Sequence, residues 1–516
     1  MNFHKADIGI HGKAVDPPFR VNAPLAIIGA GPAGLTAGYV AVHHDHTIRP
    51  LLIESSDQVG GIARTINYKG YRFDIGGHRF FTTVPEIDAM WREVLGPDFL
   101  EVERLSRIYY RRKFYSYPLQ WMNALGNLGL VESIHIILSY LKWQLWPHPV
   151  EETFEQWVIN RFGGRLFLHF FQSYTEKVWG IPCSEISAGW AAQRIRNLSL
   201  LKVVLNALTG MNKTISLIDR FHYPRLGPGM MWDAFRDRII ECDGQLVMKC
   251  AVERIVRRGN RVIELHARHA GSSAKLQNRV FIADNVISSM PLQNVVFAFD
   301  PPPPPQVLEA ARKLRYRDFL IVALIIDEPD PFPDNWIYVH GDDVKVSRIQ
   351  NFRAWSKEMV ADPKKASIGM EYFCHEGDGL WNSTDSDLIE LSGKELEALG
   401  LARRSQIVDG CVVRQPRAYP VYDATYQAAV ETIKSWMITL ENFQTVGRNG
   451  MHRYNNQDHS MLTGALAARN VLGGNYDIWN VNLERSYHEE FIVRNNPAAL
   501  AVALNGSAGH AGVRVS

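Results

Sequence analysis

The segment GAGPAG at residues 29–34 constrains the fold of this chain more than any other feature of its sequence. It follows the apolar run Pro-Leu-Ala-Ile-Ile at residues 24–28 and precedes a segment with helical character. A second apolar run, at residues 51–54, comes after that helix. Strand, glycine turn, helix and strand in this order are what a dinucleotide-binding βαβ unit requires. The sequence therefore predicts a Rossmann-like unit near its start.

The three glycines of this segment have separate roles in such a unit. Gly29 turns the chain, Gly31 removes a side chain that would block a pyrophosphate, and Gly34 lets the helix pack against the strand. Glu54 ends the second strand, where its carboxylate is placed to accept hydrogen bonds from ribose hydroxyls. These features predict a nucleotide-binding site.

A second glycine-rich loop indicates which dinucleotide is bound. The segment VGGIART at residues 59–65 contains paired glycines, Gly60 and Gly61, and Arg64 supplies positive charge near a pyrophosphate. NAD-binding domains do not need this loop. Residues 76–78 (Gly-Gly-His) then form a bend of small residues where backbone can pass against a flat ring, with His78 at its edge. Together these segments favour FAD.

The C-terminal part of the chain adds a third segment of this kind. Gly447-Arg448 is followed by NQDHS at residues 456–460 and then by a helical segment. A helix whose N-terminus faces a flavin stabilises negative charge at N1 and C2=O of the reduced ring. Asp458 and Ser460 are equally well explained as helix caps, and the two roles are compatible. The expected cofactor-binding set is Gly29, Gly31, Pro32, Ala33, Gly34, Glu54, Gly60, Gly61, Arg64, Gly76, Gly77, His78, Val252, Gly447, Arg448, Asn456, Gln457, Asp458 and Ser460.

The rest of the chain predicts a discontinuous α/β architecture. Residues 85–220 show helical periodicity and many aromatics, whereas the patterns of residues 244–290 and 318–327 are those of strands. We expect a Rossmann-like FAD-binding domain in three parts (1–83, 221–292 and 423–516), an inserted helical lobe (84–220) and a mixed β-sheet substrate domain (293–422).

Composition excludes several classes of protein. The formal charge of the 516-residue chain is +2, which gives no global electrostatic reason to propose a nucleic acid or an anionic membrane as partner. Five widely separated cysteines without a CxxC pair argue against disulfides and zinc, so we expect a cytoplasmic protein without a metal. Residues 1–22 contain no apolar run, which argues against a secretory signal. Residues 125–146 are apolar but interrupted by charges, which predicts a buried or groove-lining helix and no transmembrane span.

The order of these motifs resembles the superfamily of FAD-dependent amine oxidases, protoporphyrinogen oxidases and UDP-galactopyranose mutases. Three segments are most similar to the mutases, especially the eukaryotic ones: GGHRFFT at residues 76–82, YTEKVWGIP at 174–182, and the segment 447–460 that ends in NQDHS. Outside these collinear motifs the similarity is thin.

The resemblance implies a redox-neutral reaction that nevertheless needs reduced FAD. In the mutases the flavin N5 attacks the anomeric carbon of a nucleotide sugar, and pyranose and furanose forms interconvert. It also implies a nucleotide-sugar substrate, with NAD(P)H as a potential electron donor and an oligomer as an open option. The expected catalytic residues are His78, Arg79, Tyr419 and Arg448. The expected substrate-binding residues are Tyr117, Gln120, Gln172, Tyr174, Trp179, Arg417 and Tyr419.

The chain also departs from the mutase pattern. Gln172, and either Ile325 or Ile326, align with arginines that hold the substrate diphosphate in the mutases. This departure predicts that UDP-galactopyranose is a poor substrate unless other cations take over. The candidate cations are Arg79, Arg194, Arg225, Arg348 and Arg417. Two alternatives to a mutase stay open: an FAD oxidase or desaturase acting on an amine or an apolar ring, and a non-catalytic flavin-binding protein.

Overall fold

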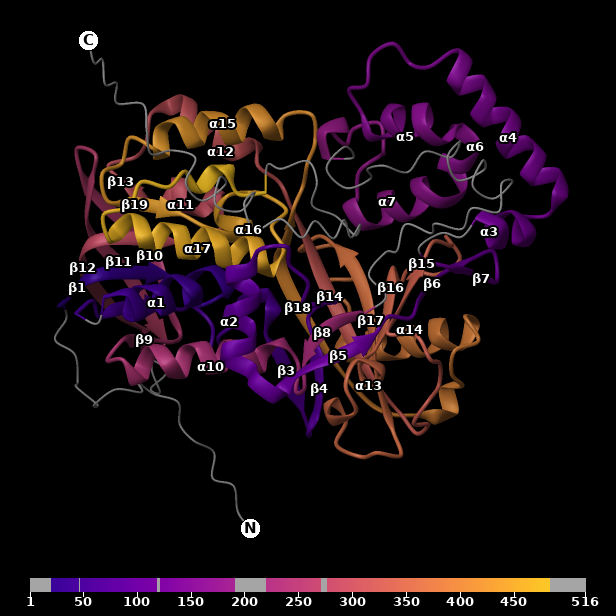
Figure 1. Cartoon of the computed structure of the whole chain (residues 1–516), viewed down its shortest axis with the longest axis horizontal. Helices are drawn as coiled ribbons and strands as arrows, with labels where there is room; N and C mark the ends of the chain where they lie inside the picture. The colour runs from indigo at the N-terminus through magenta and orange to yellow at the C-terminus, as the bar shows by residue number, and fades with distance from the viewer. Residues whose placement is uncertain (1–19, 46, 118–120, 191–219, 271–275, 483–516) are drawn as a thin grey trace, which may run out of the picture.

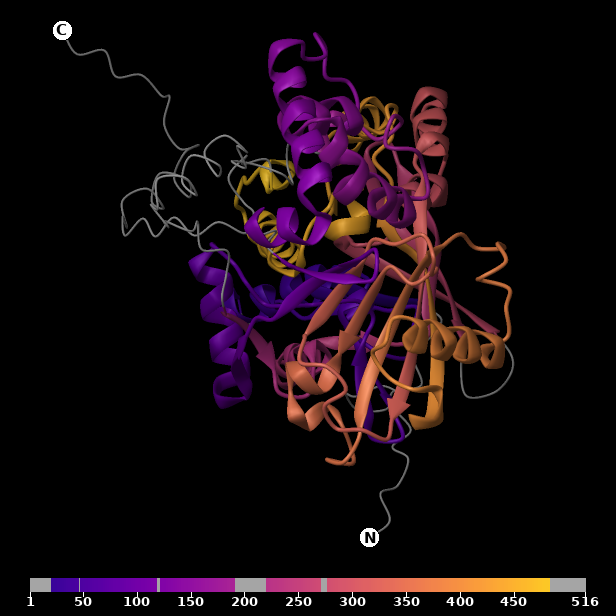
Figure 2. The same cartoon turned by 90° about the vertical axis from the view of Figure 1, so that its right-hand side faces the viewer.

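Two β-sheets form the framework of the chain, with helices packed around the first and a helical lobe above the second (Figure 1, Figure 2). The computed structural model describes residues 20–45, 47–117, 121–190, 220–270 and 276–482. Within these residues one sheet has eight strands and the other has seven.

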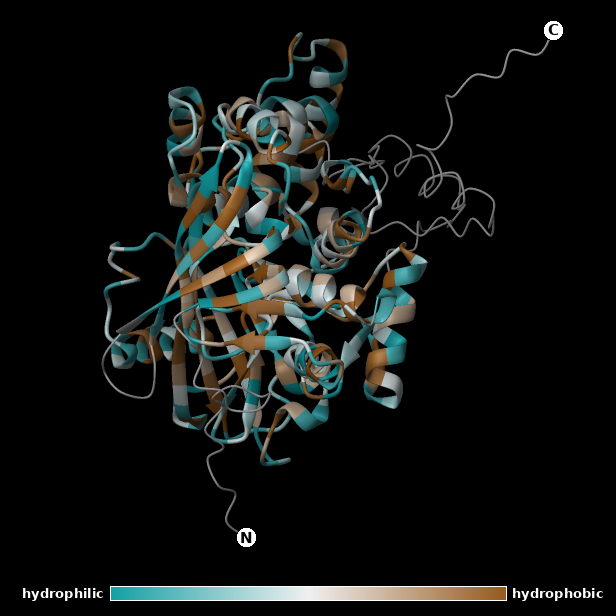
Figure 3. Cartoon of the chain, turned by 90° about the vertical axis from the view of Figure 1, so that its left-hand side faces the viewer, coloured by the Kyte–Doolittle hydropathy of each residue, from teal (hydrophilic) through white to brown (hydrophobic). Residues whose placement is uncertain are grey.

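The eight-stranded sheet contains the predicted βαβ unit. Its order is β13 (Phe299–Asp300), β10 (Cys250–Arg258), β11 (Arg261–Ala270), β12 (Leu276–Ser288), β1 (Arg20–Ile28), β2 (Pro50–Ile53) and β9 (Gln245–Val247), and β19 (Phe443–Thr445) pairs with β12. Strands β12, β1, β2 and β9 run parallel. Helix α1 (Pro32–His44) lies between α10 (Pro228–Glu241) and α17 (Gln457–Val471). The Rossmann-like fold class is confirmed, and Figure 3 shows the apolar residues on these strands.

The seven-stranded sheet is mixed, as expected for the second domain. Its order is β18 (Ile407–Pro420), β14 (Tyr316–Ile326), β17 (Ala366–Cys374), β16 (Arg348–Asn351), β15 (Trp336–Val339), β6 (Ser106–Tyr110) and β7 (Lys113–Ser116). All neighbours are antiparallel except β15 and β6. Strand β14 is almost wholly buried because both of its edges are paired and both faces are covered. Two antiparallel pairs lie outside the two large sheets. They are the hairpin of β3 (Thr65–Tyr68) with β4 (Tyr71–Asp74), and β5 (Phe99–Glu103) with the distant β8 (Arg220–Pro224).

The helical lobe lies at the upper right of Figure 1. It consists of α3 (Trp121–Leu128), α4 (Leu130–Leu145), α5 (Phe154–Phe162), α6 (Gly164–Phe167), the π-helical turn η3 (Leu168–Gln172) and α7 (Ser173–Trp179). A capping box between Thr153 and Gln156 begins α5. The remaining elements are η1 (Gly61–Ala63), α2 (Pro85–Leu95), η2 (Gly96–Asp98), α11 (Leu292–Ala298), α12 (Pro305–Lys313), α13 (Phe352–Trp355), η4 (Lys357–Met359), α14 (Asp385–Ala398), η5 (Arg404–Gln406), α15 (Tyr426–Met437), α16 (Gly447–Gly450) and η6 (Ile478–Asn480).

Two expectations about the helical region need correction. Strands β5, β6 and β7 lie within residues 85–220, where helical periodicity was expected throughout; β6 becomes a strand because it pairs with β15, more than 200 residues away. The apolar segment 125–146 is not buried overall, because one face of α4 is exposed to solvent. No described helix is long and apolar enough to cross a membrane.

Candidate active site

The glycine turn after β1 has the tight geometry that its sequence predicts. Gly29 has a φ of +96°, and its amide donates to the carbonyl oxygen of Ile53 at 2.8 Å. A Cβ on Gly34 would lie 1.9 Å from the carbonyl oxygen of Gly29, so any side chain there would displace the turn from α1. The turn therefore depends on both glycines.

The second glycine loop lies directly opposite the first. A Cβ on Gly31 would lie 3.7 Å from Cα of Gly61, and a Cβ on Gly61 would lie 3.3 Å from Cα of Gly31. The amide of Gly60 donates to the carbonyl oxygen of Ala30 at 2.8 Å, which ties the loops together. Two backbones without side chains thus face each other at the N-terminus of α1, where an anionic pyrophosphate is stabilised. This cradle fits a dinucleotide.

Glu54 and Arg64 flank this cradle. The Glu54 carboxylate accepts from the amide of Ala30 at 2.7 Å and from the amide of Ser56 at 2.8 Å, and it is 8% exposed. Its Oε1 also accepts from the hydroxyls of Ser55 at 3.2 Å and Ser56 at 2.8 Å, whereas Oε2 accepts only from the Ala30 amide among the described residues. One acceptor site of Oε2 is therefore left for a ribose hydroxyl. Arg64 donates to the carbonyl oxygen of Gly61 at 2.8 Å, and burial lowers its pKa. It buttresses the loop in this arrangement.

A cavity of about 180 Å³ opens beside the N-terminus of α17. Its lining comes from the bend after β4, from α2, from three strands of the seven-stranded sheet and from the α16–α17 connection. The lining residues are Gly77, His78, Arg79, Phe81, Trp91, Trp336, Tyr338, Arg348, Trp355, Tyr419, Arg448, Tyr454, Asn456, Gln457 and Asp458. The first and last of the three mutase-like segments, residues 76–82 and 447–460, therefore meet in one site although they lie far apart in the sequence.

His78 is held as a neutral imidazole. Its Nε2 lies 2.9 Å from the carbonyl oxygens of both Ile62 and Ile75, so this nitrogen carries the proton and Nδ1 does not. Burial lowers the His78 pKa to about 4, and the charges of Arg448 and Arg348 contribute. These hydrogen bonds link η1 to the bend at residues 76–77.

Arg348 is a fixed positive charge in the cavity. Its Nε donates to the Glu371 carboxylate at 2.7 Å, and Glu371 is fully buried and also accepts a hydrogen bond from Gln350. Burial opposes the charged guanidinium, but the negative charge of Glu371 raises the Arg348 pKa well above its usual value. Arg348 therefore stays protonated at neutral pH.

A second cation, Arg448, lies against two tyrosines. Its guanidinium is 5.2 Å from the Tyr419 ring centroid and 5.0 Å from that of Tyr454, and the two rings stack at 5.9 Å. Burial raises the Tyr419 pKa, with a contribution from Tyr454, so Tyr419 presents a neutral phenol. Arg79 adds a third cation, 5.9 Å from the ring of Trp336. The cavity is thus positively charged and aromatic.

The cap of α17 faces this cavity. Asn456 forms a capping box with His459, and Asp458 lies in the first turn with 1% exposure. The positive end of the helix dipole stabilises that carboxylate. Ser460 follows one turn after the cap, and its amide donates to the Asn456 carbonyl oxygen at 3.0 Å.

Several predicted substrate residues form the outer support of the cavity. Tyr174 stacks on His340 at 4.6 Å and contacts Tyr338, which Tyr117 also contacts at 4.9 Å. Trp179 touches the rings of Tyr419 and Tyr454. These tyrosines and the tryptophan therefore lie next to the lining.

Other predicted residues lie elsewhere. Gln172 faces a separate cavity of about 710 Å³ between the helical lobe and the second sheet. Arg417 bonds Asn294 and lies over the ring of Tyr316, outside the cavity lining. Val252 is buried in β10 opposite Ala267. Gln120 lies outside the described residues.

The departures from the mutase pattern also have definite positions. Ile325 and Ile326 are 2% and 0% exposed in β14, remote from the cavity lining. Among the alternative cations, Arg348 and Arg79 line the cavity, whereas Arg225 bonds Asp98 at 2.7 Å. Arg194 lies outside the described residues. Arg348 on β16 lines the cavity, whereas Ile325 and Ile326 on β14 do not.

Some lining residues were not predicted. Trp336 and Tyr338 alternate along β15, a period of two that places both side chains on one face of the sheet. Tyr454 lies inside the segment 447–460 and could have been found from its position there. Trp91 and Trp355 belong to helices far away in sequence and carry no local signal.

Comparison with known proteins places this geometry in a known fold. The family described as "NAD(P)-binding Rossmann-like domain" matches residues 27–94. A crystal structure of reduced UDP-galactopyranose mutase superposes with a TM-score of 0.75 at 20% identity, covering 91% of this chain and 100% of that one. The fold is that of UDP-galactopyranose mutase. The fold implied by the motifs is confirmed.

Two other structures share the mutase fold at lower similarity. A protein from Exiguobacterium sp. 255-15, provisionally assigned as a protoporphyrinogen oxidase, has a TM-score of 0.64 at 14% identity and covers 88% of this chain and 99% of that one. A putrescine oxidase bound to putrescine has a TM-score of 0.57 at 15% identity and covers 88% and 100%. The fold therefore hosts more than one chemistry.

Proposed function

We propose that the chain binds FAD across the cradle formed by Gly31 and Gly61. The two loops carry no side chains where they face each other, and Glu54 lies beside them at the end of β2. The bend at residues 76–77 and the N-terminus of α17 both border the cavity where a flavin ring would lie. A glycine cradle, a ribose-binding carboxylate and a helix N-terminus are the elements that such a cofactor needs.

We further propose a mutase-type function: interconversion of the pyranose and furanose forms of a nucleotide sugar. The observation that carries it is the cavity charge, since Arg79, Arg348 and Arg448 line it together with a single carboxylate, Asp458. Arginines bind diphosphates through charge-assisted hydrogen bonds. When bound and reduced, the flavin would supply the nucleophile for the anomeric carbon.

The chain's own residues would hold the substrate in place. Arg348 is fixed by Glu371 and would bind the diphosphate without a change of protonation. Tyr419 and Arg448 would position the leaving group, and Arg79 would neutralise the charge that develops on it. His78 fixes the bend beside the ring and offers an unprotonated Nδ1. The aromatic side chains that line the cavity would select the sugar through their contacts with it.

An amine oxidase function is the alternative, and the cavity charge disfavours it. A protonated amine would be repelled by three guanidinium groups, and an apolar ring would have to desolvate them. The aromatic lining, which includes Trp336 and Trp355, is compatible with a ring-shaped substrate. The experiment below therefore also tests for oxidase activity.

The decisive experiment compares the oxidised and reduced protein. Under anaerobic conditions a panel of nucleotide sugars is added before and after reduction with dithionite, and the sugar ring form is analysed by chromatography. We expect isomerisation only after reduction, without net oxidation of the sugar. Oxygen consumption by the oxidised protein with an amine, together with no isomerisation, would establish the oxidase instead.

A further inference from the structure

Helix α4 carries a continuous aliphatic face that is exposed to solvent. Its 16 residues place these side chains three or four positions apart, which is the spacing of one helix face. We call this set the apolar band: Leu130, Val131, Ile134, Ile137, Leu138, Leu141 and Leu145, with exposures between 45% and 78%. Trp146, which is 69% exposed, follows at its end. Soluble surfaces rarely carry so many adjacent exposed aliphatics.

The opposite face of α4 is firmly packed. Ser133, Ile136 and Tyr140 are buried against the lobe, and α4 contacts α5 and α6. A Cβ on Gly163 would lie 2.8 Å from the amide nitrogen of Tyr140, so the backbones touch closely there. The exposed band is therefore a fixed surface of a packed helix.

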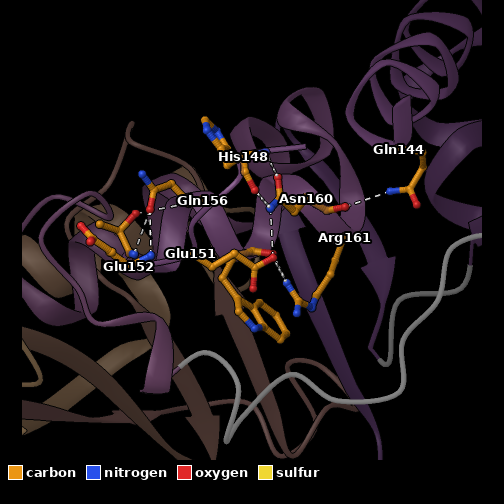
Figure 4. A network of polar contacts seen from close by, with 9 residues as sticks. Gln144, His148, Glu151, Glu152, Gln156, Asn160 and Arg161 are labelled. Atoms are coloured by element: carbon orange, nitrogen blue, oxygen red, sulfur yellow. Dashed lines mark hydrogen bonds and ion pairs between the residues drawn. The ribbon is translucent and has the colours of Figure 1, made fainter. Parts of the chain in front are cut away.

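A polar network anchors the C-terminal end of α4 to α5 (Figure 4). Gln144 donates to the carbonyl oxygen of Asn160 at 2.8 Å, and the Asn160 side chain accepts from the amide of His148 at 2.8 Å. Asn160 and Arg161 both donate to the Glu151 carboxylate. This network fixes the end of the helix and pairs the nearest acidic side chain with an arginine.

The charges around the band are predominantly positive. Lys142 is exposed on the flank of the band. Arg111 and Arg112 form the exposed turn between β6 and β7, and α3 contacts both β7 and α4. The acidic residue within α4, Glu132, is paired with Arg165 at 2.5 Å and with His169 at 2.8 Å.

We propose that α4 docks this protein onto an anionic membrane surface, with the apolar band inserted among the lipids and the helix parallel to the membrane. A helix of this length spans about 24 Å, which is shorter than a hydrocarbon core of about 30 Å, and its other face is occupied by the protein. Aliphatic side chains, flanking cations and a terminal tryptophan are the features of an interfacial helix. This inference is independent of the proposed catalytic function.

The test measures binding of the full chain to vesicles by flotation. Vesicles contain phosphatidylcholine alone or phosphatidylcholine with phosphatidylglycerol. We expect binding to the anionic vesicles, and the double variant Ile134→Gln/Leu141→Gln should weaken it about tenfold or more because two inserted side chains are lost. The matched control Val408→Gln/Ile438→Gln replaces exposed aliphatics elsewhere, 52% and 65% exposed, and should bind as the parent does.

A charge variant separates electrostatic attraction to anionic lipid headgroups from nonspecific hydrophobic binding. Arg112→Asn/Lys142→Gln should weaken binding to anionic vesicles only; asparagine tolerates the positive φ of 59° at Arg112. Circular dichroism melting checks that all variants remain folded. Absence of binding to anionic vesicles overturns the proposal. A dimer in sedimentation velocity that the Ile134→Gln/Leu141→Gln variant dissociates, without vesicle binding, assigns the band to a second copy of the chain.

Discussion

At the scale of single residues, the facing glycines Gly31 and Gly61 separate cofactor binding from folding. A Cβ on Gly31 would be at ordinary contact distance from Gly61, so a side chain there fits the protein but fills the proposed pyrophosphate space. We expect Gly31→Val to fold and to retain little or no flavin after purification. The measurement is the flavin absorbance per chain, with far-ultraviolet circular dichroism as the check on folding.

A neighbouring glycine provides the contrast. In Gly34→Ala a single methyl group would overlap the Gly29 carbonyl oxygen, so this smaller change should lower the melting temperature even when no cofactor is present. Gly126→Val, at a position with no neighbouring atom within 4 Å, serves as the control. Full flavin content in Gly31→Val would place the pyrophosphate elsewhere.

Buried histidines predict how stability depends on pH. Burial lowers the pKa of His452 to about 4, and His78 behaves in the same way. Because the unfolded chain then binds more protons than the folded chain between about pH 6.5 and pH 4, stability should fall as the pH falls through this window. Thermal melts at pH 7 and pH 5 should show this, and His452→Gln should show a smaller difference.

Asp74 acts in the opposite direction over the same range. Burial raises its pKa to about 7, although Tyr223 and Thr65 donate hydrogen bonds to it. The folded chain therefore keeps this proton, and stability is lost as the pH rises from the ordinary pKa of the carboxyl to about 7. Asp74→Asn should make the acid destabilisation steeper. If the melting temperature changed by the same amount between pH 7 and pH 5 in this variant and in the parent, the raised pKa of Asp74 would be contradicted.

At the scale of elements, the sequence predicts what is encoded locally. The βαβ unit has its strand, turn and helix signals within residues 24–54, and the fold confirms it. Strand β6 was missed because it pairs with β15, which lies far away in sequence, whereas β7 forms a local hairpin with β6 that the helical interpretation of this region missed. The cavity follows the same division: His78 and Tyr419 lie in recognisable motifs, whereas Arg348 reaches it through the register of β16 with β17.

The packing of α1 on α17 joins the Rossmann-like unit to the C-terminal part of the described chain. A Cβ on Gly464 would lie 2.1 Å from the carbonyl oxygen of Ala33, so the two helices are in backbone contact. We expect Gly464→Ala to destabilise the protein by about 1–3 kcal/mol, measured by urea denaturation, because the helices must separate. Gly379→Ala, where no atom lies within 4 Å, is the control. Equal stability of both variants would mean that α17 shifts freely.

At the scale of the whole molecule, one cavity collects residues from the seven-stranded sheet and from the connection that leads into α17. Tyr419 and Arg348 come from the seven-stranded sheet, while Gln457 and Asp458 belong to the helix that packs on the Rossmann-like unit. Binding in this cavity therefore bridges the two parts of the molecule. A ligand that contacts both parts stabilises them together, by a free energy that rises with the logarithm of its concentration relative to its dissociation constant.

The position of this cavity beside the proposed flavin site predicts how the flavin would be reduced. The sequence contains one GxGxxG-type segment that follows a strand, at residues 29–34, and the proposed FAD occupies it. A nicotinamide must then reach the flavin through the substrate cavity, where Arg79, Arg348 and Arg448 can bind its phosphates as they would bind a nucleotide sugar. We expect NAD(P)H to reduce the flavin and nucleotide sugar to slow this reduction competitively. Stopped-flow absorbance of the flavin measures the rate, and a rate unaffected by saturating nucleotide sugar would mean that the two ligands use separate routes.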